Sequence, residues 1–250
     1  MSIKASAAIL VFLTAPLLAQ EPPAKRIRAS RPLALYSAID SPNAEVLDYG
    51  GFAFSSRFFN KGGLLPSVSF GVFQRLMLGA SLQLDNYIGH GNIDLQRPEL
   101  QMKFRFYDGD RYLPAAAIGY DSQGYRYDKI TKEYGEPERG LYLALTQEVL
   151  WRGLEWTAGA NVSDFEQDSI RAFTNLTWVP PGGMIAFLAE YDNIHHTRWN
   201  RLNGGANLFL SPFVQMGFHV RDILGRQTHQ NSSDLRRPER IIDVRYLTSF

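Results

Sequence analysis

The stretch Arg240-Ile-Ile-Asp-Val-Arg-Tyr-Leu-Thr-Ser-Phe250 decides how this chain of 250 residues folds. Ile242 and Val244 fall on one side of an extended chain, whereas Asp243 and Arg245 fall on the other, because successive side chains of a strand point to opposite faces. The pattern therefore predicts a strand with one apolar and one polar face. The free edge of such a strand needs a partner, and in a closed barrel this partner is the first strand.

The same alternation recurs along the chain in short segments. In one of them Met102 and Phe104 oppose Lys103 and Arg105. Strands that cross a membrane in a tilted barrel have about 9–11 residues, which is close to the length of these segments. Twelve of them can be drawn, at residues 49–59, 65–73, 76–86, 99–107, 113–121, 140–150, 154–163, 170–179, 184–192, 199–210, 213–221 and 240–250.

The connections between the segments alternate in length. Gln74-Arg75 and Ser211-Pro212 are tight turns, whereas residues 122–139 and 222–239 form long polar loops. Short turns at one end and longer loops at the other are typical of outer-membrane barrels with both termini in the periplasm. We therefore predict an all-β, 12-stranded antiparallel transmembrane β-barrel with short periplasmic turns and longer extracellular loops.

Aromatic side chains gather at the ends of the segments. Amphipathic rings prefer the headgroup level of a membrane, so this placement predicts two aromatic girdles. The rings are Trp151, Trp156, Trp178, Tyr112 and Phe213 near the turns, and Trp199, Tyr87, Tyr120 and Tyr191 near the loops. The alternative is a soluble sandwich or barrel with its apolar face inside, which alternation alone does not exclude. Small residues and opposite charges on the polar face favour a crowded lumen.

The first residues are typical of an exported protein. Lys4 precedes an apolar run that ends at Ala19-Gln20, which is the order of a cleaved secretory signal peptide. We predict a signal peptide at 1–19, a periplasmic arm at 20–44 and the barrel at 45–250. Residues 21–42 are rich in proline and basic residues, which favours a solvated arm. The alternative is an arm that folds back into the mouth of the barrel.

Composition and motifs exclude several classes of function. The chain has 26 Lys and Arg against 25 Asp and Glu, and no Cys, so nothing indicates nucleic acid, a disulfide or a thiolate site. After the first twenty residues no apolar run of about 18 positions could form a membrane helix. His195 and His196 point to opposite faces, and the loop-side residues Asp85, Asp121 and Asp192 lack the spacing of an EF-hand. We therefore predict neither a metal nor a cofactor.

No catalytic site is predicted. A hydrolase on a barrel wall needs a Ser beside a His at matching depth, with a third group that orients the His. The strands that flank His219 offer no such Ser, and no phosphate-binding loop motif occurs. We expect a protein that is not an enzyme.

The charged residues of the polar face are the candidate functional residues. Basic side chains come from the last three segments and the first, whereas acidic ones come mainly from the middle of the chain. Either they pair across a narrow lumen and hold it shut, or they set a transverse field across a water-filled constriction. The candidates are Arg57, Lys103, Arg105, Glu148, Glu155, Glu190, Asp192, Arg201, His219, Arg221 and Arg245.

Several stretches resemble a known group of barrels. Among them are Gly79-Ala-Ser-Leu-Gln-Leu-Asp-Asn-Tyr-Ile-Gly89 and Val220-Arg-Asp-Ile-Leu-Gly225. Together they resemble the YjbH-type outer-membrane β-barrels, some of which are linked to exopolysaccharide production. The aromatic end of the chain, with Tyr246 and Phe250, likewise resembles the assembly signal of outer-membrane barrels. The resemblance implies contact with outer-membrane lipids, lipopolysaccharide and the barrel-assembly machinery.

These observations predict a protein of the bacterial outer membrane. It would act as a narrow passive pore or a structural envelope component, linked by the resemblance to exopolysaccharide export. The partner in the lumen would be a polysaccharide or a small polar solute. The alternative is a surface binding or adhesion protein that acts through residues 122–139 and 222–239.

Overall fold

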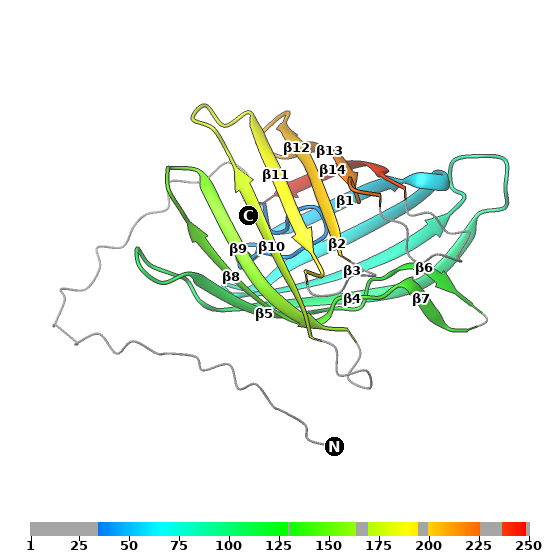
Figure 1. The fold of residues 1–250 in the computed structure, drawn as a ribbon, viewed down its shortest axis with the longest axis horizontal. Coiled ribbons are helices and arrows are strands. Elements are labelled where there is room, and N and C mark those ends of the chain that lie inside the picture. The colour runs from blue at the N-terminus through cyan, green and yellow to red at the C-terminus, as the bar shows by residue number, and fades with distance from the viewer. Residues whose placement is uncertain (1–34, 130, 164–169, 195–199, 226–236, 249–250) are drawn as a thin grey trace, which may run out of the picture. The chain divides into compact units, whose positions relative to one another are not determined.

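The computed structural model describes residues 35–129, 131–163, 170–194, 200–225 and 237–248. They form strands joined by turns, loops and one short 3-10 helix (Figure 1). The elements are β1 Phe52–Phe59, η1 Asn60–Gly62, β2 Gly63–Phe73, β3 Leu76–Asp85, β4 Asp94–Tyr107, β5 Ala115–Asp121, β6 Tyr125–Asp128, β7 Glu133–Glu136, β8 Gly140–Glu148, β9 Leu154–Val162, β10 Ile170–Trp178, β11 Ile185–Asp192, β12 Arg201–Phe209, β13 Val214–Arg221 and β14 Glu239–Thr248. Among these residues no helix is long and apolar enough to cross a membrane.

Twelve of the strands close into one barrel. Each barrel strand is antiparallel to the next along the chain, with β8 following β5, and β14 pairs with β1 from Phe52–Thr248 to Phe58–Ile242. Closure satisfies the backbone groups of both edges, which an open sheet would leave unpaired. The prediction of an all-β, 12-stranded antiparallel barrel is confirmed, and all twelve predicted segments contain a barrel strand.

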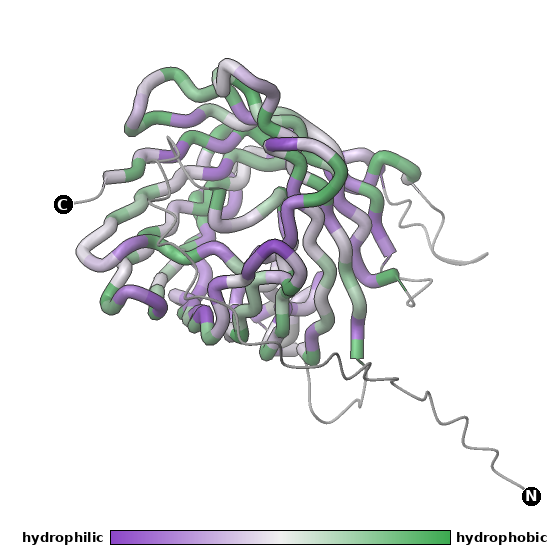
Figure 2. The backbone as a smooth tube through the Cα atoms, turned by 90° about the vertical axis from the view of Figure 1, so that its left-hand side faces the viewer, coloured by the Kyte–Doolittle hydropathy of each residue, from purple (hydrophilic) through white to green (hydrophobic). Residues whose placement is uncertain are grey.

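The apolar face of the strands points outward. In β4, Lys103 and Arg105 are 3% and 9% exposed, whereas Phe104 between them is 43% exposed. Polar and apolar residues alternate in the same way along the other strands (Figure 2). In β13 and β14, likewise, His219 and Arg245 are buried and Phe218 is exposed. The soluble alternative, with an apolar interior and charges in bulk water, is therefore wrong.

Aromatic rings mark both ends of the apolar belt. Trp151, Tyr112 and Phe213 are exposed beside the short turns, and Tyr87 and Tyr120 are exposed at the loop end. Trp178 stacks on Phe187 with ring centroids 5.8 Å apart. Trp199, the His195-His196 pair, the terminal Phe250 and residues 1–34, with the expected signal peptide, lie outside the described residues.

Strand β4 begins earlier than the sequence indicates. The sequence predicts a segment that starts at residue 99 after a polar loop. The strand instead starts at Asp94, and Pro98 pairs with Leu82 beside a register shift between Leu82 and Leu84. The irregular pairing at this point accommodates the proline.

The long loop between β5 and β8 contains a second, separate sheet. Strands β6 and β7 form a two-stranded hairpin, with Tyr125 opposite Glu136 and Tyr127 opposite Tyr134. We call residues 125–136 the mouth hairpin, because its contacts lie at the loop end of the barrel. The alternation pattern did not predict it, since each of its strands has only four residues.

Residues 35–46 lie inside the barrel, where Figure 1 shows the start of the described chain in blue, enclosed by strands. We call this segment the lumen finger. It turns back at its tip, where the Ala38 N–H donates to the Ser41 carbonyl at 2.9 Å and Ser37 bridges to Pro42. Ile39 is 1% exposed. Of our two interpretations of the arm, the fold-back into the barrel describes these residues, and the solvated arm does not.

Candidate functional site

The tip of the lumen finger is an aspartate between two arginines. Arg57 of β1 approaches one carboxylate oxygen of Asp40 at 2.9 Å, and Arg221 of β13 approaches the other at 3.4 Å. The hydroxyl of Tyr125 donates to the first oxygen at 3.4 Å. Burial raises the pKa of Tyr125 to about 12, which keeps this hydroxyl protonated at neutral pH. Asp40 therefore joins the finger, the barrel wall and the mouth hairpin.

These arginines keep Asp40 charged. Burial alone would raise the pKa of Asp40, but Arg221 and then Arg57 outweigh it and hold the pKa below its usual value of 3.8. A carboxyl group that is more acidic when docked stabilises the docked state at every pH above its usual pKa. This contribution is lost only as the pH falls below 3.8 towards the docked pKa, so the contact is complete at neutral pH.

Glu190 of β11 holds the backbone of the finger. Its carboxylate accepts from the N–H of Asp40 at 3.0 Å, and from the N–H and the hydroxyl of Ser41, both at 2.7 Å. Asn203 also donates to it. Glu190 is 1% exposed, and a carboxylate so deeply buried is tolerated because these donors replace water.

Lys103 and Arg105 of β4 hold the two arms of the finger. The Lys103 ammonium donates to the carbonyls of Tyr36 at 2.6 Å and Glu45 at 3.0 Å. Arg105 pairs with the Glu45 carboxylate at 3.1 Å. On β8, which is separated from β4 by β5 alone, the hydroxyl of Thr146 accepts the N–H of Ala44 at 2.9 Å. The finger is thus bound to the wall on several sides.

We expect Glu190→Ala to loosen the finger, because each buried donor left without an acceptor costs about 1–3 kcal/mol. The chain has no Cys, so Ala38→Cys introduces one thiol into the buried tip. Maleimide modification of this thiol should accelerate at least about tenfold in the Glu190→Ala background. Glu190→Gln keeps one acceptor oxygen and should lie between the two. Equal rates in all three would show that Glu190 does not hold the finger.

The mouth hairpin is bound to strands β12 and β13 of the barrel wall. Glu136 forms ion pairs with Arg201 and, at 3.3 Å, with Arg221. Just beyond the hairpin, Arg139 pairs with Asp192 at 3.0 Å and donates to the Asp40 carbonyl at 3.2 Å. Charged residues on β11, β12 and β13 therefore hold residues 136–139 of this loop at the lumen.

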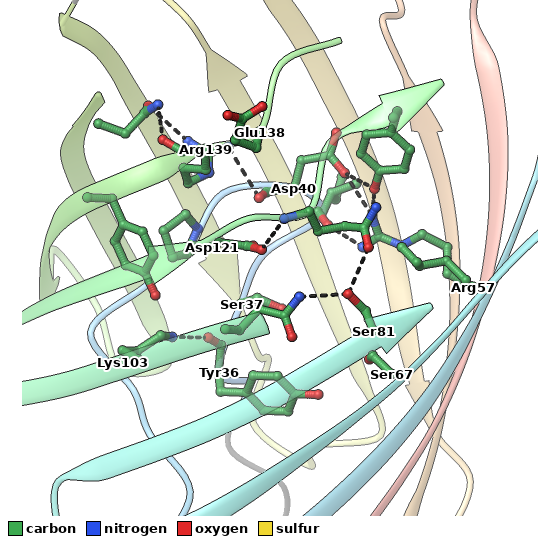
Figure 3. Close-up of a pocket in the computed structure, with 18 of the residues that line it drawn as sticks. Tyr36, Ser37, Asp40, Arg57, Ser67, Ser81, Lys103, Asp121, Glu138 and Arg139 are labelled. Atoms are coloured by element: carbon green, nitrogen blue, oxygen red, sulfur yellow. Dashed lines mark hydrogen bonds and ion pairs between the residues drawn. The ribbon is translucent and has the colours of Figure 1, made fainter. Parts of the chain in front are cut away.

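A cavity of about 200 Å³ remains beside the finger (Figure 3). Hydroxyl groups of Ser55, Ser67, Ser69 and Ser81 line it on β1, β2 and β3. Figure 3 shows Ser37 of the finger, Lys103, Ser81, Asp121 and Arg139 among the residues that line it. Charged groups of both signs reach it, so the cavity is polar but carries little net charge.

The predicted lumen residues fall into four groups. Arg57, Lys103, Arg105, Glu190 and Arg221 contact the finger directly, as described above. Arg201, Asp192 and Arg245 form ion pairs at the wall, the last with Asp243 at 2.8 Å. His219 is buried and its Nε2 lies 2.8 Å from Asn207. The fourth group is the acidic pair Glu148 and Glu155, which lies at the rim beside the turn that follows β8.

The expected separation into a basic and an acidic wall does not hold. Asp243 and Glu239 stand on β14 within the basic wall, where they pair with Arg245 and Arg221. Glu148 is exposed at the turn end, where its carboxylate accepts the N–H of Gly153 at 2.7 Å. These charges pair with near neighbours on the same or the adjacent strand, so their fields largely cancel.

Sequence reasoning missed the residues that complete this site. Asp40 was assigned to the arm, Glu45 to the barrel ahead of its first strand, and Tyr125 and Glu136 to a loop. One signal was present: Leu35, Ala38 and Ile39 are apolar residues in an otherwise polar arm, and they pack against Ala186 and Leu188 of β11. Among the described residues no group of three or more His, Cys, Asp or Glu could hold a metal ion.

Comparison with solved structures places the fold among outer-membrane barrels. The KdgM porin aligns with 80% of this chain and 99% of its own, with a TM-score of 0.51 and 10% identity. The NanC porin and the Acinetobacter baumannii outer membrane protein Omp33 align over 80% and 82% of this chain, at 10% and 13% identity. They cover 99% and 100% of their own chains, with TM-scores of 0.43 and 0.44. No protein-family model matches the sequence, and no curated protein is significantly similar to it.

At 10% identity the likeness to the KdgM porin concerns the fold alone. Together with an outward apolar belt and a polar lumen, it defines a β-barrel of the outer-membrane type. Two of the proteins named above are porins and the third is an outer membrane protein, and the YjbH-type group is not among them.

Proposed function

We propose that this protein is a narrow passive pore of a bacterial outer membrane. The observation that carries the proposal is the cavity of about 200 Å³ that remains between the lumen finger and the barrel wall, where serines of β1–β3 and charged residues of both signs line it. Barrels of eight strands are filled by side chains, whereas 16–18 strands leave a wide channel. A twelve-stranded barrel that contains a finger falls between these limits, so the pore is restricted to small solutes.

The lining of the cavity indicates what it admits. Serine hydroxyls and the amide of Gln101 offer hydrogen bonds to a polar solute, whereas neighbouring charges such as Arg245 and Asp243 are already paired. Pores are selective through the donors, acceptors and charges that line them. We infer that small polar solutes such as sugars pass, and that selectivity between anions and cations is weak.

A suitable test of the pore adds a charge to the lining of the lumen without breaking an ion pair. Arg221 contacts Asp40, Glu136 and Glu239, so reversing its charge would disturb the fold as well as the pore. Ser67 lines the cavity and bonds only Ser55 among the contacts described, at 2.6 Å. We expect the wild type to give discrete conductance steps in planar bilayers. Ser67→Lys should shift the reversal potential towards anion selectivity and Ser67→Glu towards cation selectivity.

A matched control places the same charges outside the barrel. Leu210 is exposed in the turn between β12 and β13, so Leu210→Lys and Leu210→Glu should leave the selectivity of a lumen pore unchanged. The proposal is wrong if the wild type gives no steps. It is also wrong if steps appear but both Ser67 variants share the wild-type reversal potential.

Further parts of the proposal come from the sequence. We infer export through a signal peptide cleaved after residue 19, and insertion by the barrel-assembly machinery into a membrane of lipids and lipopolysaccharide. The resemblance to YjbH-type barrels supports a link to exopolysaccharide export. Deleting the gene should then lower surface polysaccharide, and the Ser67 variants should restore it to different extents. Unchanged polysaccharide would leave a pore without this link.

The adhesion alternative receives no support from the described loops. Half of its proposed surface, residues 122–139, contains the mouth hairpin, which is bound to Arg57, Arg201 and Arg221. The remainder, residues 222–239, lies largely outside the described residues. The pore therefore remains the function that the geometry supports best.

A further inference from the structure

The lumen finger and the mouth hairpin meet at the same side chains. Arg57 binds the Asp40 carboxylate and also donates to the Tyr125 hydroxyl and the Ile39 carbonyl. Two elements that are far apart in sequence thus share one arginine of β1.

Arg221 repeats this arrangement on the other side of the tip. Its guanidinium pairs with Asp40 at 3.4 Å and with Glu136 at 3.3 Å, and lies 4.2 Å from the centre of the Tyr125 ring. Arg139, which follows the hairpin, donates to the carbonyl of Asp40. Asp40 is therefore surrounded by three arginines, each of which also touches the hairpin or the loop that follows it.

Charge explains why this arrangement couples the two elements. Removing one partner from a buried ionic network leaves an uncompensated charge, which is strongly destabilising. If Asp40 leaves, Arg57 and Arg221 lose a shared counter-ion, Arg139 loses a carbonyl acceptor, and Tyr125 loses an acceptor. The contacts that hold the hairpin in place are then weakened, even though none of the hairpin's own residues has changed.

Outside the lumen the hairpin is held less firmly. Lys129 pairs with Asp94, and Arg97 lies 4.9 Å and 5.3 Å from the ring centres of Tyr127 and Tyr134. The Lys129 and Arg97 side chains are about half exposed, and exposed ion pairs contribute little. The position of the hairpin therefore depends mainly on its buried contacts, which are those of Tyr125 and Glu136 with Arg57, Arg201 and Arg221 and the bond from Tyr134 to Glu99.

We propose that the lumen finger and the mouth hairpin form one autoinhibitory latch, which the contacts of Asp40 hold closed. The docked finger fills the lumen and seats the hairpin over the loop end. Release of the finger frees the hairpin too, so both obstructions leave together. The consequence for permeation rests on the proposed pore, but the coupling itself is independent of conductance.

The test measures the hairpin while the change is made in the finger. Lys129 and Lys132 are exposed in the connection between β6 and β7, so trypsin can cut there once the hairpin lifts. In purified protein in detergent micelles, Asp40→Asn should raise the cleavage rate at these two sites at least about tenfold. Asp94→Asn removes the outer ion pair of Lys129 but does not touch the finger, and should change the rate less than about twofold.

A reversible lock completes the test. The Ser41 hydroxyl lies 2.8 Å from the Asn175 amide, so Ser41→Cys with Asn175→Cys can join the finger to β10 by a disulfide. In the Asp40→Asn background the oxidised protein should show slow cleavage at Lys129 and Lys132 and low conductance, and reduction should raise both.

The alternative outcomes separate the two proposals. If maleimide reaches Ala38→Cys in the Asp40→Asn background while hairpin cleavage stays at the wild-type rate, the latch is refuted. If Asp40→Asn fails to release the finger, the same cleavage assay on a chain whose finger is replaced by a Gly/Ser linker decides, and unchanged cleavage refutes the latch. Absent conductance steps in the wild type would refute the pore but not the coupling.

Discussion

A chain whose residues 35–46 are replaced by a Gly/Ser linker of equal length should conduct several times more ions than the wild type. The lumen finger occupies the middle of the barrel and leaves a cavity of about 200 Å³ beside it. Conductance through a pore follows the width and the lining of its constriction. Without the finger, only the barrel wall bounds the constriction, which is therefore wider. The conductance step in planar bilayers should be larger for this reason.

The barrel should remain closed without its finger. Its strands are joined to each other by ladders that do not pass through residues 35–46. Lys103 and Arg105 lose their partners on the finger, but in an emptied lumen water replaces those partners. Heat-modifiable migration on a gel should therefore persist. A conductance step equal to that of the wild type would mean that the ion path does not run beside the finger.

The second large effect concerns the outer surface. Phe218→Arg should destabilise the barrel in lipid by about 2–4 kcal/mol, because an arginine at the middle of the lipid-facing belt leaves water for hydrocarbon. Phe218 lies outward in β13, opposite Ile242 of β14 and Ala206 of β12, and is 46% exposed. Denaturant-induced unfolding in lipid vesicles measures the difference.

Leu210→Arg is the matched control for this substitution. Leu210 is 58% exposed in the turn between β12 and β13. Near the membrane interface the same change costs only about 0–1 kcal/mol. Equal destabilisation at both positions would show that the exposed apolar face does not meet lipid.

The strands and their faces followed from the sequence alone. Alternation such as that of Lys103, Phe104 and Arg105 depends only on neighbouring residues, because a strand repeats every two residues. Twelve short runs, tight turns and an edge that needs a partner then leave closure as the consistent solution. The same reasoning assigned Lys103 and Arg105 to the polar face, and these side chains are 3% and 9% exposed.

The contents of the lumen were decided by the tertiary structure. Asp40, Tyr125 and Glu136 come from segments without periodicity, and their roles depend on Arg57 and Arg221, which lie on distant strands. Pairing of charges depends on which strands face each other across the barrel and on depth, as the exposed position of Glu148 at the rim shows. Local pattern fixes which way a side chain points. Which partner it meets is fixed only when remote segments are brought together inside the closed barrel.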